Sequence, residues 1–131
     1  MSKVKALIGK EKYRVEITSP SGNSLFADEP VAVGGKNAGF SPKELLVSSL
    51  AACTSITLKM YAEHKGWDLE LVNVEIDLEY NKDKNESLIR RNIRVTGQLD
   101  HEQKESLLKV ANKCPLHKIL TGSIHIDTDL T

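Results

Sequence analysis

The stretch Phe40–Tyr61, with the sequence FSPKELLVSSLAACTSITLKMY, constrains the fold more than any other part of the chain. Ser41 and Glu44 form a capping box at its start, with a proline at the first helical position between them. Gly66 supplies a left-handed stop. The side chains between these signals are mostly small or aliphatic. We therefore predict one long helix that is surrounded by protein, with Cys53 near its centre.

The remaining sequence predicts strands that are joined as hairpins. Apolar residues alternate with polar ones in most segments, and turn residues separate the segments. We expect strands over residues 3–8, 12–18, 25–27, 69–80, 88–99 and 123–130, a long irregular loop over 28–40, a second helix from Asp100 to a break at Lys113, and a short helix over 116–120. This order predicts one α+β domain over residues 1–131, with mostly antiparallel sheets around the long helix.

Charge and composition exclude several classes of function. The chain has 18 Lys plus Arg and 18 Asp plus Glu, so no excess of charge favours nucleic acid or an acidic membrane surface. We find no leader pattern at the start and no uninterrupted apolar run of spanning length. These features predict a cytoplasmic protein with no nucleic acid or membrane partner, in a compartment where thiols are normally reduced.

The chain has two cysteines, Cys53 and Cys114. Cys114 precedes a proline, which predicts a cap position at the start of the short helix. Lys113, His117 and Lys118 add positive charge nearby, a setting that lowers the pKa of a thiol. Two unrelated buried thiols and a redox pair both remain open on this basis.

Cys53 lies in the middle of its helix and gains little from the helix dipole. Glu44, nine residues earlier, is turned by roughly 180° around the helix axis at about 100° per residue. It therefore cannot meet Cys53 across one helical face, and we expect its role to be capping. An activating charge has to come from elsewhere in the fold.

Arg91 falls on the apolar face of the strand predicted over 88–99. An arginine at a strand end that reaches solvent explains this position most simply, and a buried arginine that binds an anion is the alternative. The cysteines and histidines lack the spacing of a metal site, and Cys114 with His117 is only half of one. We predict no metal and no other cofactor.

Three segments together resemble the OsmC/Ohr family, which comprises osmotically inducible protein C and the organic hydroperoxide resistance proteins. They are GFSPKELL at 39–46, LAAC at 50–53 and ANKCPLHKIL at 111–120. The resemblance covers nearly the whole chain and the order of its elements. It is strongest for the OsmC-like branch, in which a Gly-Gly loop precedes the helix.

This resemblance implies an OsmC-like fold in an intertwined homodimer and a thiol peroxidase that reduces organic hydroperoxides. Cys53 would be the peroxidatic thiolate, which becomes a sulfenic acid, and Cys114 the resolving thiol. A dithiol, such as that of a lipoylated protein, would reduce the resulting disulfide. The alternative is a protein of the same fold that binds a ligand or modifies thiols without significant peroxidase activity.

The chain departs from characterised members of that family at the positions that activate the thiolate. Those members carry a glutamate ten residues before the first cysteine, where this chain has Lys43, with Glu44 one position later. They also carry an arginine in an N-terminal strand or in the loop before the helix. Here Arg14 and Lys36 are the basic candidates. We expect the activating or orienting groups among these four residues or in the partner chain.

Overall fold

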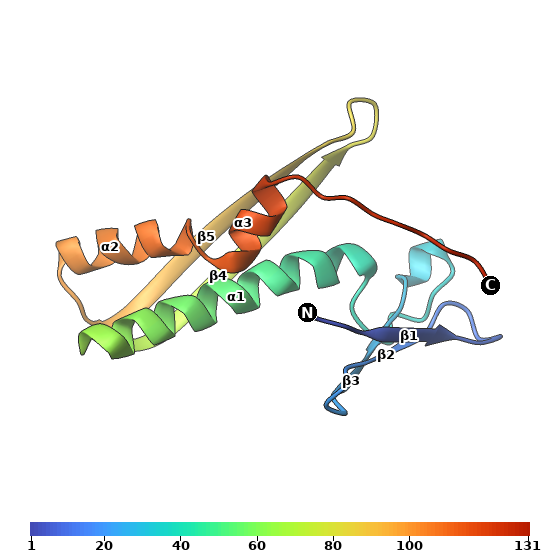
Figure 1. Ribbon diagram of the computed structural model, residues 1–131, viewed down its shortest axis with the longest axis horizontal. Helices are drawn as coiled ribbons and strands as arrows, with labels where there is room; N and C mark the ends of the chain where they lie inside the picture. The colour runs from blue at the N-terminus through green and yellow to red at the C-terminus, as the bar shows by residue number, and fades with distance from the viewer. The chain divides into compact units, whose positions relative to one another are not determined.

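The computed structural model describes all residues, 1–131, and the chain forms two compact units, Met1–Leu46 and Val47–Thr131. Each unit has its own antiparallel sheet, of three strands in the first and two in the second (Figure 1). The long helix begins in the first unit and runs through the second.

The N-terminal unit contains a meander of three short strands, β1 (Lys5–Ile8), β2 (Val15–Thr18) and β3 (Ser24–Ala27). Each strand pairs with the next in antiparallel register, as the sequence predicted. The first two strands are shorter than predicted, because the connection between them takes up residues 9–14.

A buried carboxylate organises the loop after β3. Asp28 is only 3 % exposed. Its two oxygens accept hydrogen bonds of 2.8 to 3.3 Å from the backbone N–H groups of Tyr13, Glu29, Lys36 and Ala38. One side chain therefore fixes a loop that has a single turn of 3₁₀ helix, η1 (Val31–Val33), as its only regular structure.

Two glycines allow this loop to fold back on the backbone. A Cβ at Gly35 would overlap the carbonyl oxygen of Glu29, and a Cβ at Gly39 would overlap that of Phe26. Any larger residue would push the backbone away from these carbonyl groups. The loop glycines are thus required by close packing of the chain against itself.

The predicted long helix is α1 (Pro42–Lys65). The Ser41 N–H donates to Glu44 Oε1 at 2.8 Å, and the Glu44 N–H donates to Ser41 Oγ at 3.2 Å. Both bonds of the predicted capping box are therefore present. Gly66 follows the last turn with φ of 71°, which confirms the left-handed stop.

Within one chain, only one stripe of α1 is buried. Leu50, Thr54, Leu58 and Ala62 recur every four residues and face the core of the second unit. On other faces, Ile56 is 54 % exposed and Met60 is 65 % exposed. The sequence predicted a helix surrounded by protein, but a single chain leaves these faces of α1 exposed. By length and composition alone α1 could span a membrane, a property that core helices of globular proteins share.

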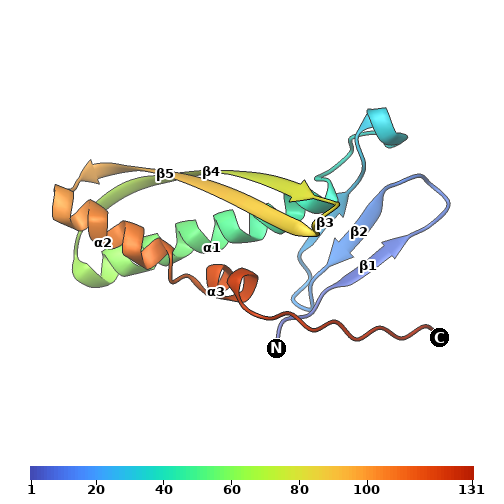
Figure 2. The same cartoon turned by 90° about the horizontal axis from the view of Figure 1, so that it is seen from above.

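The second unit packs its helices on one face of a long hairpin. Strands β4 (Asp68–Asn81) and β5 (Glu86–Gln98) form the hairpin, and α2 (His101–Ala111) and α3 (Pro115–Thr121) follow. Figure 2 shows α1 running along the hairpin, and α2 lying beside the C-terminal part of α1. The core consists of Leu58, Ala62, Leu69, Leu107 and Ala111, with Val72, Ile93 and Val95 packed against it.

The strand predicted over 123–130 is wrong for the isolated chain. Residues 122–131 form no helix or strand after α3. The apolar side of the predicted alternation is open to solvent, with exposed fractions of 61 % at Ile124, 78 % at Ile126 and 99 % at Leu130. A strand needs a neighbour for its backbone hydrogen bonds, and no strand of this chain pairs with the segment.

Replacing Asp28 with asparagine should lower the melting temperature by several degrees at neutral pH, because an amide NH₂ would face backbone N–H donors. Burial raises the pKa of Asp28, but the four backbone N–H donors outweigh it, so this pKa lies below its ordinary value. The stabilising contribution is therefore present above the ordinary carboxyl pKa and is lost as the pH falls through the folded-state pKa.

The difference in melting temperature between wild type and Asp28→Asn should shrink on acidification, as followed by circular dichroism. Asp83→Asn, a change at an exposed hairpin position, is the matched control and should melt with the wild type. Equal melting temperatures for Asp28→Asn and the wild type at neutral pH would contradict this role of Asp28.

Candidate active site

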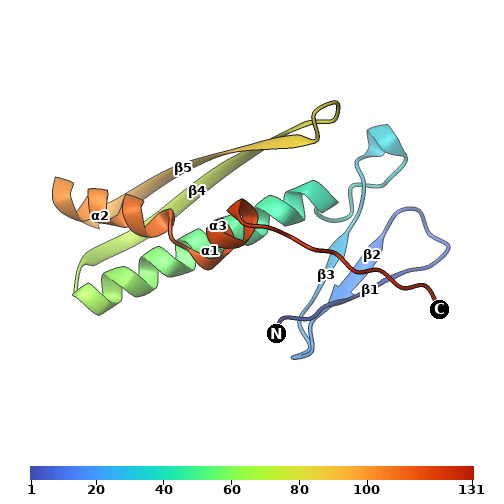
Figure 3. The ribbon, with the colours of Figure 1, turned by 45° about the horizontal axis from the view of Figure 1, so that its top comes forward.

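The structure brings the two cysteines together. Cys53 lies on α1 and Cys114 directly precedes α3, and Figure 3 shows α3 close to the middle of α1. Cys53 is half-buried on α1, and its Sγ lies 3.9 Å from Thr57 Oγ1. Cys114 is fully buried in the residue before α3. Both thiols are free, and the Cys53 side chain is one of the groups that lower the pKa of Cys114. They therefore form one dithiol site.

Cys114 occupies the cap position that the sequence predicted for it. Its backbone is extended, with φ of −64° and ψ of 150°, and Pro115 is the first residue of α3. The backbone N–H of His117 donates to Cys114 Sγ at 3.4 Å. The Cys-Pro sequence thus aims the sulfur back toward α1 and β5 instead of into solvent.

Arg91 is the charged residue of the site. It lies in the middle of β5 and is half-buried, so the expectation of a strand-end arginine that reaches solvent is wrong. Its Nη1 donates to Thr54 Oγ1 at 3.0 Å and contacts Cys114 Sγ at 4.0 Å. Its Nη2 donates to Asn112 Oδ1 at 3.1 Å and contacts His117 Nδ1 at 3.0 Å. Four side chains thereby hold the guanidinium in place.

The contact between Arg91 and His117 defines the tautomer of the imidazole. A guanidinium has only donors, so His117 Nδ1 is the acceptor in this contact. The imidazole is therefore neutral here and carries its proton on Nε2. A protonated imidazole would present a donor to a donor and break this bond.

Among the four partners of Arg91, only Cys114 can carry a negative charge. Thr54, Asn112 and the neutral His117 accept hydrogen bonds as uncharged groups, and no carboxylate pairs with the guanidinium. A partly buried cation without a compensating anion is unfavourable. This arrangement favours the thiolate form of Cys114.

The pKa of Cys114 reflects this balance. Burial raises the pKa of the thiol. Hydrogen bonds from the His117 N–H and from the Cys53, Thr54 and Arg91 side chains outweigh burial, so the pKa lies below the ordinary thiol value. The Thr54 hydroxyl itself donates to Leu50 O at 2.7 Å.

The predicted activating residues have partners within the N-terminal unit. The Arg14 guanidinium stacks over the Phe26 ring at 3.8 Å from its centroid, and Lys36 Nζ lies 3.4 Å from Glu11 Oε1. Lys43 and Glu44 lie in the first turn of α1, where the Ser41 N–H lowers the pKa of the Glu44 carboxyl. Their action on the cysteines stays a prediction.

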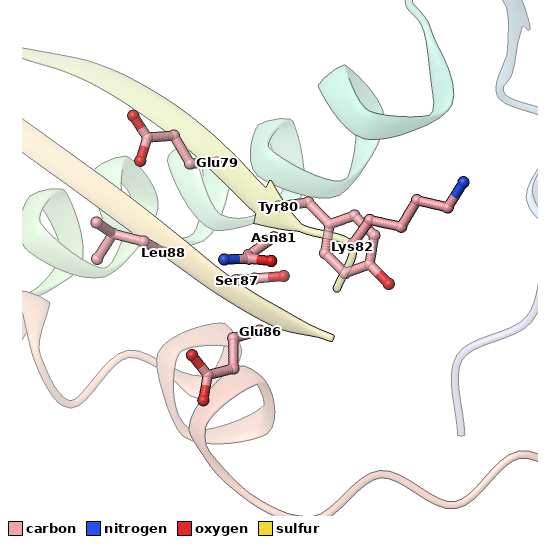
Figure 4. Close-up of a pocket in the computed structure, with 7 residues that line it drawn as sticks. All are labelled: Glu79, Tyr80, Asn81, Lys82, Glu86, Ser87 and Leu88. Carbon is pink, nitrogen blue, oxygen red and sulfur yellow. The ribbon is translucent and has the colours of Figure 1, made fainter. Parts of the chain in front are cut away.

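No three histidine, cysteine or acidic side chains come together in a way that could hold a metal ion. The half-site of Cys114 and His117 is already engaged, because Nδ1 of His117 accepts from Arg91. A hollow of about 810 Å³ lies at the tip of the β4–β5 hairpin and is lined by residues 79–82 and 86–88 (Figure 4). It contains neither cysteine.

Comparison with known proteins agrees with the fold. The sequence profile described as OsmC-like protein matches residues 34–129, which is most of the chain. This chain belongs to the OsmC-like family. No curated protein matches the sequence.

Solved structures of OsmC-like proteins share the fold. A putative osmotic stress induced and detoxification response protein from Psychrobacter arcticus is 25 % identical, with a TM-score of 0.79 over 95 % of this chain and 89 % of that one. An OsmC-like protein from Mycoplasma pneumoniae is 21 % identical, with a TM-score of 0.78 over 93 % and 88 %. An organic hydroperoxide resistance protein OsmC from Legionella pneumophila is 23 % identical, with a TM-score of 0.69 over 93 % and 90 %. The α+β fold with its long central helix is therefore that of OsmC-like proteins.

Sequence reasoning underrated Arg91 and overlooked Thr54 and Asn112 as parts of this site. The available signal was a charged residue in phase with the apolar face of β5, where burial requires a partner. The partners of Arg91 lie 21 to 37 positions away in sequence, so no local motif joins them.

Proposed function

We propose that this OsmC-like protein is a thiol peroxidase that reduces organic hydroperoxides, with Cys53 as the peroxidatic residue and Cys114 as the resolving residue. The observation that carries the proposal is the dithiol site, in which a half-exposed cysteine adjoins a buried cysteine beside a guanidinium. Peroxide reaches the more accessible sulfur first, and the buried one is placed to condense with it.

The chemistry proceeds in two steps. The Cys53 thiolate attacks the terminal peroxide oxygen, the O–O bond breaks, and Cys53 becomes a sulfenic acid while an alkoxide leaves and is protonated to the alcohol. The Cys114 thiolate then attacks Cys53 Sγ and expels hydroxide, which forms water and leaves a disulfide. A dithiol reductant, such as a lipoylated protein, restores both thiols by exchange.

Apolar binding without peroxidase activity is the second candidate. An open hollow of about 420 Å³ lies between α1 and β4, lined mainly by apolar side chains that include Ala51, Ala52 and Val72. Such a surface suits the alkyl group of a hydroperoxide, and it equally suits an apolar ligand that is never oxidised. Oxidation of the thiols by peroxide separates the two candidates.

The purified protein should consume an alkyl hydroperoxide in the presence of dihydrolipoamide, faster than it consumes hydrogen peroxide. Cys53→Ser should abolish this turnover. Cys114→Ser should stop at a sulfenic acid on Cys53 that dimedone traps, as detected by mass spectrometry. Ser48→Ala, a change of similar size on the same helix, is the control and should retain turnover. Undiminished turnover in Cys53→Ser would contradict the assignment.

The working unit in this proposal is a cytoplasmic, intertwined homodimer. The exposed apolar residues of α1 and the alternating pattern of 123–130 support it, because a second chain can cover the former and pair with the latter. Arg14, Lys36, Lys43 or Glu44 of the partner chain would then be available to orient the Cys53 thiol.

Sedimentation equilibrium should give twice the mass of the chain. Ile126→Lys should weaken the dimer, because it places a charge on the apolar side of the alternating segment. Asp129→Lys lies on the polar side of that segment and is the matched control, so it should leave the mass unchanged. A monomeric mass for the wild type at micromolar concentration would exclude the intertwined assembly.

A further inference from the structure

Oxidation of the proposed dithiol site leaves Arg91 without an anion. The guanidinium has four side-chain partners, and Cys114 is the only one that can carry a negative charge. A disulfide sulfur is neutral, and none of the salt bridges of the chain includes Arg91. Formation of a disulfide at Cys114 therefore removes the one charge that compensates this half-buried cation.

The contacts that fix the guanidinium do not depend on the sulfur. Nη1 of Arg91 donates to Thr54 Oγ1 at 3.0 Å, and Nη2 donates to Asn112 Oδ1 at 3.1 Å. Both acceptors are neutral groups that oxidation of the cysteines does not change. We therefore expect the positive charge to stay beside the Cys114 sulfur in both redox states.

The burial of the two sulfurs decides which one a reductant attacks. Cys53 is half-buried, whereas Cys114 is fully buried. Thiol–disulfide exchange is faster at an accessible sulfur and when the leaving thiolate is stabilised. Attack at Cys53 releases Cys114, whose sulfur accepts from the His117 N–H at 3.4 Å and contacts Arg91 Nη1 at 4.0 Å. Burial and charge thus select the same leaving group.

We propose that Arg91 drives the oxidised protein back to its dithiol state, because a dithiol reductant attacks Cys53 and Cys114 leaves as a thiolate beside the guanidinium. This inference rests on the proposed peroxidase function and assigns Arg91 to its recycling step. Arg91 is a positioning residue, since it acts only through Cys114. Its consequence is a disulfide that is more oxidising than the same pair without the guanidinium.

The exchange consists of two displacements. One thiolate of the reductant attacks Cys53 Sγ, the S–S bond breaks, and Cys114 leaves as a thiolate. The second thiolate of the reductant then attacks its own sulfur in the mixed disulfide and releases Cys53. Two electrons pass to the cysteine pair, and the reductant becomes a disulfide. One of its two protons stays with the pair, and the other goes to solvent because Cys114 is released without a proton.

No other charge replaces Arg91 next to the Cys114 sulfur. The titratable groups near it are Cys53 on α1, Arg91 on β5, His117 on α3 and the exposed Lys113 and Lys118. His117 is neutral, since its Nδ1 accepts from Arg91, and α2 contributes only the uncharged Asn112. The surface lysines are screened by solvent and salt. The guanidinium is therefore the group whose removal should change the redox equilibrium.

Redox equilibration of the full-length protein tests the inference. The protein is equilibrated at neutral pH with graded ratios of reduced to oxidised glutathione, quenched with acid and alkylated, and the fraction with a Cys53–Cys114 disulfide is measured by mass spectrometry. Arg91→Met should favour the disulfide at least tenfold, which is about 30 mV for a two-electron couple. Arg91→Lys should regain part of this change. Arg94→Met, on the exposed face of β5, is the control and should match the wild type.

Asn112→Asp separates the charge of Arg91 from its packing. Residue 112 is exposed, and an aspartate there keeps an acceptor for Nη2 while it supplies the anion that Arg91 otherwise finds only in Cys114. This variant should therefore also favour the disulfide, with the guanidinium still present. Asn92→Asp adds the same charge on the exposed face of β5 and should leave the equilibrium unchanged.

The difference between Arg91→Met and the wild type should depend on pH. The pKa of Cys114 lies below its ordinary value, because hydrogen bonds to the sulfur outweigh burial. The difference should be full above the ordinary thiol pKa and should shrink as the pH falls through the lowered pKa, where the reduced protein carries a neutral thiol. A purely structural role of Arg91 would give a difference that does not follow this titration.

Equal equilibrium constants for Arg91→Met and the wild type at neutral pH would overturn the inference. If the wild type forms no Cys53–Cys114 disulfide at any glutathione ratio, the resolving role of Cys114 fails and the inference fails with it. If the equilibrium shifts as expected but cumene hydroperoxide leaves Cys53 of the wild type reduced, the role of Arg91 is supported and the peroxidase function fails alone.

Discussion

The contact between the Arg91 guanidinium and the Cys114 sulfur is the interaction on which the proposed chemistry of this chain depends. At 4.0 Å, two unit charges attract by about 4 kcal/mol at an effective dielectric constant of about 20, and solvent around the half-buried arginine reduces this. A neutral hydrogen bond contributes only about 1 kcal/mol. The attraction to Arg91 is therefore the strongest of the interactions that favour the thiolate form of Cys114. The neutral partners of Arg91 aim its charge at the sulfur without neutralising it.

Three elements of the fold hold Arg91 and Cys114 in contact. The buried stripe of α1 fixes the helix on the β4–β5 hairpin and carries Thr54 next to Cys53. The Cys-Pro sequence before α3 returns the chain to the same place. The site therefore combines three elements, α1, β5 and the start of α3, that meet only after the second unit has folded.

Local signals predicted much of this fold. The capping box of α1, the hairpin strands and the cap position of Cys114 depend on residues within a few positions of one another, and the structure confirms each of them. Arg91 is different, because its role depends on partners from three other parts of the chain. The apolar alternation of 123–130 shows that a correct local pattern can still lack its partner. It indicates a strand, but pairing is a property of the neighbour, and one chain offers none.

The most direct test of this account is the titration of the Cys114 thiolate by its ultraviolet absorbance, in a Cys53→Ser background where the serine hydroxyl can still donate. The account predicts a midpoint below the ordinary thiol pKa of about 8.5, and a return toward that value when Arg91→Met is added. A midpoint at or above the ordinary value, unchanged by Arg91→Met, would contradict the claim that Arg91 ionises Cys114.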